Sequence, residues 1–135
     1  MECERLEIVE AWKIIEAKHA CLDYSKIEAS GAEHMHWEDV SLVGTKIMNA
    51  NMSHFEVDGA QMGGAYIHNI GIPKEGDLHY NPDIAKLPVR FEHCDFHGAQ
   101  FTKCDLSNVE LMDCEVKGMK INGILVEDLL KLISE

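Results

Sequence analysis

The stretch that decides the fold is Cys94-Asp95-Phe96-His97-Gly98-Ala99-Gln100-Phe101-Thr102-Lys103-Cys104-Asp105-Leu106-Ser107-Asn108. Apolar residues recur in it every five positions, at Phe96, Phe101 and Leu106. This spacing matches neither the 3.6-residue period of a helix nor the two-residue period of a strand. The stretch therefore predicts a chain that repeats its conformation every five residues.

The five-residue period extends on both sides of this stretch and gives fifteen apolar centres in two runs. The centres are Trp37, Leu42, Ile47, Met52, Val57, Met62, Ile67 and Ile72, then Phe91, Phe96, Phe101, Leu106, Leu111, Val116 and Ile121. Only 46% of the chain is apolar, so an unbroken series of this length indicates a true repeat. Three weaker centres, Leu22, Ile27 and Ala32, extend the first run back to residue 20.

Each centre has characteristic neighbours. The residue two positions before it is usually small, as Cys94 and Ala99 are, and the residue two positions after it is usually a turn former. The turn formers are Asp39, Gly44, Asn49, Gly59, Gly64, Asn69, Gly98, Asn108, Asp113, Gly118 and Gly123. Glycine, asparagine and aspartate tolerate a positive φ. The pattern predicts a chain that turns after every short extended step and winds into a solenoid.

The repeat resembles the motif of the pentapeptide-repeat family, which is a small residue, Asp or Asn, Leu or Phe, a polar residue, then Gly or a similar residue. Cys104-Asp105-Leu106-Ser107-Asn108 is nearly ideal, and the resemblance covers about Met35 to Gly123. It implies an all-β fold, a right-handed quadrilateral β-helix with four pentads in each coil. Residues twenty apart would then stack one strand spacing apart.

We expect one domain over residues 1–135, since the length suits a single core. Its expected parts are an N-terminal capping helix over 1–19, repeat runs over 20–72 and 89–125 with an ejected loop over 73–88 between them, and a C-terminal helix over 126–135. The helices are indicated by apolar residues at helical spacing, which are Ile8, Ala11, Trp12 and Ile15 at one end and Leu129, Leu130 and Ile133 at the other. Capping would cover open strand edges. A terminal helix or an exchange of the loop could instead form a homodimer.

The loop is indicated by Pro73, Pro82 and Pro88, which are all the prolines of the chain and cannot donate to a strand ladder. Loops of solenoids commonly carry function. We expect its contact residues for a partner to be Asp77, Leu78, His79 and Tyr80. The alternative is a loop folded onto the coils by Leu78, Ile84 and Leu87.

Four side chains form a candidate metal site. His34 and His36 lie one predicted coil away from His54 and Glu56, so three imidazoles and a carboxylate could share one face. The alternative is that these histidines are solvated. The five cysteines are odd in number and include no CxxC pair, so we expect reduced thiols.

The net charge and the absence of known motifs exclude several classes of function. The net charge of −12 repels nucleic acid and anionic lipid, and the acidic amino end and the lack of long apolar runs predict a cytoplasmic protein without a membrane span. No active-site motif is present, so we expect no enzyme and no cofactor.

The leading hypothesis is a non-catalytic scaffold that binds another protein through acidic faces and the loop. The resemblance implies an alternative, a DNA-mimicking modulator of DNA gyrase or topoisomerase. The histidine cluster gives a third, a metal-binding protein.

Overall fold

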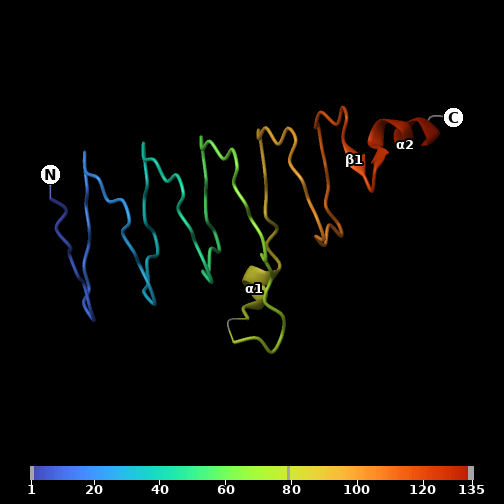
Figure 1. Cartoon of the computed structure of the whole chain (residues 1–135). Helices are drawn as coiled ribbons and strands as arrows, with labels where there is room; N and C mark the ends of the chain where they lie inside the picture. Colours follow the sequence, from blue (N-terminus) through green and yellow to red (C-terminus); the bar gives the residue numbers. More distant parts are fainter. Residues whose placement is uncertain (1, 79, 134–135) are drawn as a thin grey trace. The chain divides into compact units, whose positions relative to one another are not determined.

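The computed structural model describes residues 2–78 and 80–133 and divides the chain into two units, Met1–Val57 and Asp58–Glu135. Four elements occur in the described residues, all of them in the second unit. They are α1 (Pro82–Ala85), β1 (Lys120–Ile121), β2 (Ile124–Leu125) and α2 (Val126–Ile133) (Figure 1). Most of the described chain therefore consists of extended steps and bends.

Corners recur every five residues, as predicted. The residue two positions after the centre has a positive φ in fourteen of the fifteen predicted pentads, and Lys74 is the exception. Positive φ also occurs at Tyr24, Ala29 and His34, which follow the three weaker centres and lack the usual turn chemistry. The period of the apolar centres thus determines where the chain turns, even where the corner residue itself is unfavourable for a left-handed backbone.

From Leu42 onward, two kinds of corner alternate along the repeats. In one kind the N–H of the residue three positions after the centre donates to the carbonyl oxygen of the centre, as Ala65 does to Met62 over 2.9 Å. These closed corners follow Leu22, Leu42, Met52, Met62, Phe96, Leu106 and Val116. From Leu42 onward the corners between them have a positive φ without this bond, so the conformation there repeats fully only after ten residues.

The acidic or amide residue before the centre has a local role at closed corners. Its side-chain oxygen accepts a hydrogen bond from the backbone N–H of the residue after the centre. Three instances are Asn51 with Ser53 (3.1 Å), Asp95 with His97 (2.9 Å) and Asp105 with Ser107 (2.9 Å). Such side-chain bonds satisfy a backbone donor and favour the turn.

In the second run, the cysteine two positions before three of the centres also bonds to the backbone. The thiols of Cys94 and Cys114 each lie 3.2 Å from the carbonyl oxygen two residues earlier, and the thiol of Cys104 lies 3.5 Å from its equivalent. All five cysteines are free thiols in the structure.

The centres face a different side from their neighbours. Apart from the half-buried Val116, the fifteen centres have exposed fractions of 39–65%, whereas the apolar residues directly beside a centre, Val43, Met48, Tyr66 and Met112, have 74–95%. No described side chain is fully buried. The centres are thus less exposed than their neighbours, as the pentad pattern requires. The described residues do not, however, form the buried core that stacked centres would give.

The segment 73–88 leaves the repeating path of the second unit (Figure 1). The next closed corner after Met62 is due at Ile72, and the loop begins there instead. The following centres, Phe91 and Phe96, resume with an open and then a closed corner. The loop therefore takes the place of one corner and keeps the alternation intact.

The carboxyl end of the array is a hairpin followed by a helix. Lys120 pairs with Leu125 and Ile121 with Ile124 in the antiparallel pair β1–β2, with Asn122 and Gly123 at positive φ between them. Asn-Gly favours this tight hairpin turn. Ile121, predicted as a repeat centre, therefore lies in β1 at a chain reversal, with its corner residue Gly123 in the hairpin turn. The segment predicted as helix over 126–135 contains α2, and residues 134 and 135 lie outside the described residues.

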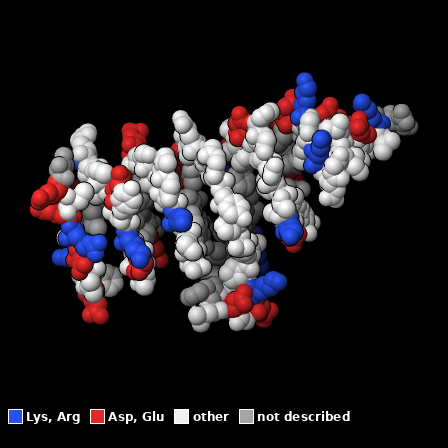
Figure 2. Space-filling model, viewed as in Figure 1, with Lys and Arg blue, Asp and Glu red and all other residues white. Residues whose placement is uncertain are grey.

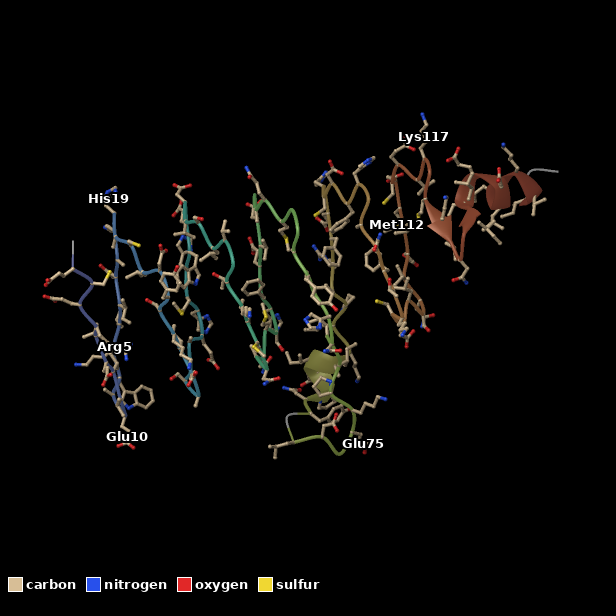
Figure 3. All side chains as sticks on the ribbon, viewed as in Figure 1. Arg5, Glu10, His19, Glu75, Met112 and Lys117 are labelled. Carbon is tan, nitrogen blue, oxygen red and sulfur yellow. The ribbon has the colours of Figure 1, made fainter. Side chains whose placement is uncertain are left out.

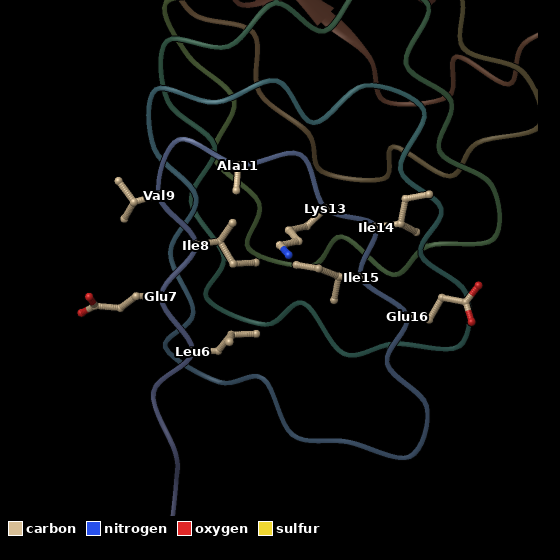
Figure 4. Close-up of a pocket in the computed structure, with 9 residues that line it drawn as sticks. All are labelled: Leu6, Glu7, Ile8, Val9, Ala11, Lys13, Ile14, Ile15 and Glu16. Atoms are coloured by element: carbon tan, nitrogen blue, oxygen red, sulfur yellow. The ribbon is translucent and has the colours of Figure 1, made fainter.

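The predicted N-terminal helix over 1–19 is wrong for the described residues 2–19, which contain no helix. Corner conformations occur instead at Glu10 (φ 49°) and His19 (φ 52°), the two bends labelled in Figure 3. Leu6, Ile8, Ala11 and Ile15 then point toward the hollow that this first turn encloses (Figure 4). The same apolar residues suit a helix face and an inward coil face, so the spacing alone did not decide between them.

Candidate interaction site

The loop over residues 73–88 is folded by its own hydrogen bonds. The N–H of Lys74 donates to the Asp77 carboxylate (2.7 Å), and the N–H of Asp77 donates back to the Lys74 carbonyl (2.9 Å). The N–H of Tyr80 then donates to the Asp77 carbonyl (3.1 Å). These bonds close two consecutive turns within the loop.

The helix α1 forms the second half of the loop. Asn81 caps it by accepting from the Asp83 N–H (3.0 Å), and Pro82 occupies its first position, where no backbone donor is needed. The N–H of Leu87 donates to the Ile84 carbonyl (3.0 Å) as the helix ends. The loop thus has a defined conformation that uses bonds within residues 74–87.

The four predicted contact residues differ in what they offer a partner. Leu78 is 92% exposed and its apolar side chain is available for contact. Asp77 uses its carboxylate inside the loop, and Tyr80 is much less exposed than Leu78. His79 lies outside the described residues. Of the residues in the alternative, a loop folded onto the coils, Ile84 is half-buried, whereas Leu78 and Leu87 are exposed.

Sequence reasoning missed three residues that shape this site. Lys74 supplies backbone groups that position Asp77, and Asn81 begins α1. The dipeptide Asn81-Pro82 is the usual signal for a helix start, so α1 could have been predicted. Glu75, labelled in Figure 3, adds an exposed carboxylate to the loop.

The candidate metal residues are not assembled into a site. His34 and His54 lie at corners with φ 59° and 62°. His36 bonds through Nε2 to Glu38 (3.1 Å), a partner absent from the predicted set. Among the described residues, no group of three or more histidine, cysteine or carboxylate side chains could hold a metal ion, so His34, His36, His54 and Glu56 are not brought together.

Charged side chains of both signs are interspersed. Arg5 pairs with Glu7 (4.0 Å), Lys26 with Glu28, and Arg90 with Glu92 (3.0 Å). Red and blue atoms accordingly lie next to each other in several places on the visible face, which is otherwise mostly white (Figure 2). Exposed pairs of this kind stabilise a fold weakly, so their main effect is on the electrostatic surface.

One carboxylate has a shifted pKa. The Ser107 hydroxyl donates to Asp105 Oδ1 over 2.6 Å, and the Ser107 N–H donates to the same oxygen over 2.9 Å. These two bonds favour the ionised form and lower the pKa of Asp105 below its ordinary value of 3.8. The Asp105 carboxylate therefore has a structural role, which is to hold Ser107 in the corner.

Comparison with known protein families identifies the repeat. Residues 89–123 match the family model described as pentapeptide repeats, with eight copies. Residues 89–123 thus carry pentapeptide repeats, in agreement with the resemblance seen in the sequence, and such repeats imply a fold of the β-helix type in general. Proteins of this family are generally non-catalytic scaffolds.

The matched segment lies within the second of the two predicted runs. Corners of the first run, outside the match, have the same period. No curated protein and no solved structure matches the chain. None of the helices in the described ranges is long and apolar enough to cross a membrane.

Proposed function

We propose that the chain is a non-catalytic pentapeptide-repeat scaffold that binds another protein through the loop over residues 73–88. The observation that carries this proposal is the loop itself, which departs from the repeat, is folded by internal bonds and exposes Leu78. A loop already ordered before binding loses less conformational entropy when it binds. The acidic side chains of the repeats would contribute the rim of the contact.

The scaffold we propose is a right-handed quadrilateral β-helix with four pentads in each coil. Support comes from the corner at every fifth residue and from the alternation of closed and open corners. Stacking of successive coils would cover the centres, whose burial contributes about 25 cal/mol for each square ångström removed from water. The hairpin and α2 would then cover the last coil.

A second proposal concerns the partner, which is DNA gyrase or a related topoisomerase engaged by DNA mimicry. The net charge of −12 supports it, because an enzyme surface that holds DNA is basic. The interspersed positive charges weaken it, since a mimic of the phosphate backbone needs continuous negative charge. The general scaffold proposal does not depend on this partner.

The test combines a supercoiling assay with direct binding. Purified chain is titrated into a gyrase reaction beside a variant in which a short Gly-Ser linker replaces residues 75–86. Inhibition by the first and not by the second supports gyrase as the partner and the loop as the contact. Inhibition by both supports gyrase and excludes the loop. No inhibition at tens of micromolar overturns the gyrase proposal.

The same two proteins serve as baits when gyrase is not inhibited. A protein retained by the full chain and lost with the loop variant supports the scaffold proposal, provided that the purified partner binds with the same dependence on the loop. Equal retention by both baits overturns the role of the loop. A substitution on a repeat, Val43→Asp, controls for a general loss of apolar contact, because Val43 is exposed to the same degree as Leu78.

A further inference from the structure

The segment over residues 4–18 has a sequence suited to one conformation and a structure in another. It contains no Gly or Pro, and its apolar residues Ile8, Ala11, Trp12 and Ile15 recur at helical spacing. The structure instead places it in extended steps with a corner at Glu10. The apolar spacing of this segment therefore conflicts with its conformation, whereas in the repeats the five-residue spacing of the apolar centres agrees with the position of the corners.

In the coil conformation, a charged side chain of the segment points inward and large apolar side chains are exposed. The Lys13 side chain points into the hollow of the first turn, beside Ile8 and Ile15 (Figure 4). Its neighbours Trp12 and Ile14 are 101% and 94% exposed. A coil stacked on this turn would have to enclose an ammonium group and leave an indole in water, and both are unfavourable.

Few bonds hold the segment in this conformation. No backbone hydrogen bond involves residues 2–21 in the described part of the chain. The ion pair between Arg5 and Glu7 spans 4.0 Å and is exposed. Glu10 has a φ of 49°, a left-handed conformation that is unfavourable for a residue with a Cβ. The coil state of the segment is therefore weakly stabilised.

A helix over the same residues removes each of these conflicts. Ile8, Ala11, Trp12 and Ile15 would share one face, and Lys13 would lie away from that face. Glu10 would take a right-handed φ, three residues before Lys13, at a spacing that favours a pair of opposite charges. A helix of about 15 residues is marginal in isolation, so the helical state needs the apolar face to be covered.

We propose that residues 4–18 form a conformational switch between the coil state seen in the structure and an amphipathic helix. In the helical state Trp12 packs on the first repeats and Lys13 lies in solvent, so the first coil is covered. In the coil state Trp12 and Ile14 are available to another surface. The switch concerns a different part of the chain from the loop and does not depend on the proposed function.

Paired substitutions at Glu10 test the switch in the full chain. Glu10→Gly suits a positive φ and disfavours a helix, whereas Glu10→Ala has the opposite preferences. We expect the ratio of helical to coil populations to differ between the two variants on the order of tenfold. Far-UV circular dichroism reports the helix, and ¹⁹F NMR of chains labelled with 5-fluorotryptophan reports Trp12, with its resonance assigned by Trp12→Phe.

Controls separate the switch from a general effect on stability. The same pair at Asp39, a corner with φ 52° inside the first run, should change neither the helical signal nor the Trp12 resonance under folding conditions. Opposite shifts of the helical signal and of Trp12 in the two Glu10 variants support the proposal. Identical signals in both variants, or shifts in the same direction, overturn it, because a segment with one conformation has no population to move.

Discussion

The ring of Tyr66 is stacked on the ring of His68, with 4.0 Å between the ring centroids and 11° between the ring planes. The two residues flank the centre Ile67, and the flanking side chains of a short extended step point to the same side. The same relationship joins Lys26 with Glu28, His36 with Glu38, and Arg90 with Glu92. The outer surface of the array is therefore built from pairs of contacting side chains, one pair across each of these centres.

Two adjacent glycines provide a test of the corners. Gly64 has a φ of 77°, whereas Gly63 does not have a positive φ, and neither has an atom within 4 Å of an added Cβ. We expect Gly64→Ala to lower the free energy of unfolding by about 1 kcal/mol, the cost of a left-handed alanine. Gly63→Ala should be neutral or slightly stabilising. Urea denaturation of both variants measures the difference, and equal effects would contradict the role of Gly64.

Asp105 and Ser107 predict a dependence on pH. Since the hydrogen bonds lower the pKa of Asp105, the stability that its ionised form contributes is present above pH 3.8 and is lost as the pH falls through the lowered pKa. Ser107→Ala removes the hydroxyl bond and should raise that pKa toward 3.8 without reaching it, because the bond from the backbone N–H remains. NMR titration of the carboxyl carbon measures it.

The control for this titration is Ser107→Thr, which keeps a hydroxyl at the same position. We expect its Asp105 pKa to stay near that of the unsubstituted chain. An Asp105 pKa that is the same with alanine as with serine would show that the hydroxyl bond has no effect on the carboxylate.

Glu127 joins α2 to the last repeat corner. Its carboxylate accepts from the Gly118 N–H over 2.6 Å, and the Val126 N–H donates to the Met119 carbonyl over 3.0 Å. Glu127→Ala should lower the free energy of unfolding by about 1 kcal/mol and speed hydrogen exchange at the Gly118 amide. Asp128→Ala, which removes only an exposed pair with Lys131, should leave exchange at Gly118 unchanged.

Asn81 determines the order of the loop. Removing its capping oxygen in Asn81→Ala should destabilise α1 by about 1 kcal/mol. Because α1 has four residues and few other supports, we expect limited proteolysis within residues 73–88 to accelerate. Asn81→Asp keeps the capping oxygen and serves as the control. Equal cleavage rates for alanine and aspartate would show that the cap is dispensable.

The corners could be predicted because one short period determines them. The eleven corner residues identified by their turn chemistry all have positive φ. Corners at Tyr24 and Ala29 show that the periodic position outweighs the preference of the individual residue. The alternation of closed and open corners was not predicted, since it depends on a backbone bond that both kinds of sequence can make.

The ends were harder to predict because each allowed two conformations. Ile8, Ala11 and Ile15 fit an inward coil face as well as a helix face, and the positions of Trp12 and Lys13 distinguish the two. Asn122-Gly123 suits both a pentad corner and a hairpin turn. The hairpin forms because residues on its two sides, Ile121 and Ile124, can pair, and pairing partners are a tertiary property.

The sequence indicated the position of the candidate loop but not the hydrogen bonds within it. Three prolines predicted the loop, and Leu78 within it is exposed, while its contact with a partner stays a prediction. The internal use of Asp77 depends on the backbone path of Lys74, which composition does not reveal. The histidine set was chosen for stacking twenty residues apart, and the bond from His36 to Glu38 shows that a neighbour two residues away is a nearer partner.

The alternation of corners also restricts how the gene of such an array can change in length. Duplication of ten residues copies one closed and one open corner and leaves every later corner in its original environment. Duplication or loss of five residues exchanges the two kinds at every later position, so that Asp95 and Asp105 would precede open corners, where no bond of this kind occurs among the described residues. Arrays of this type should therefore grow and shrink by pairs of pentads, and a single inserted pentad is tolerated only beside a break such as the loop.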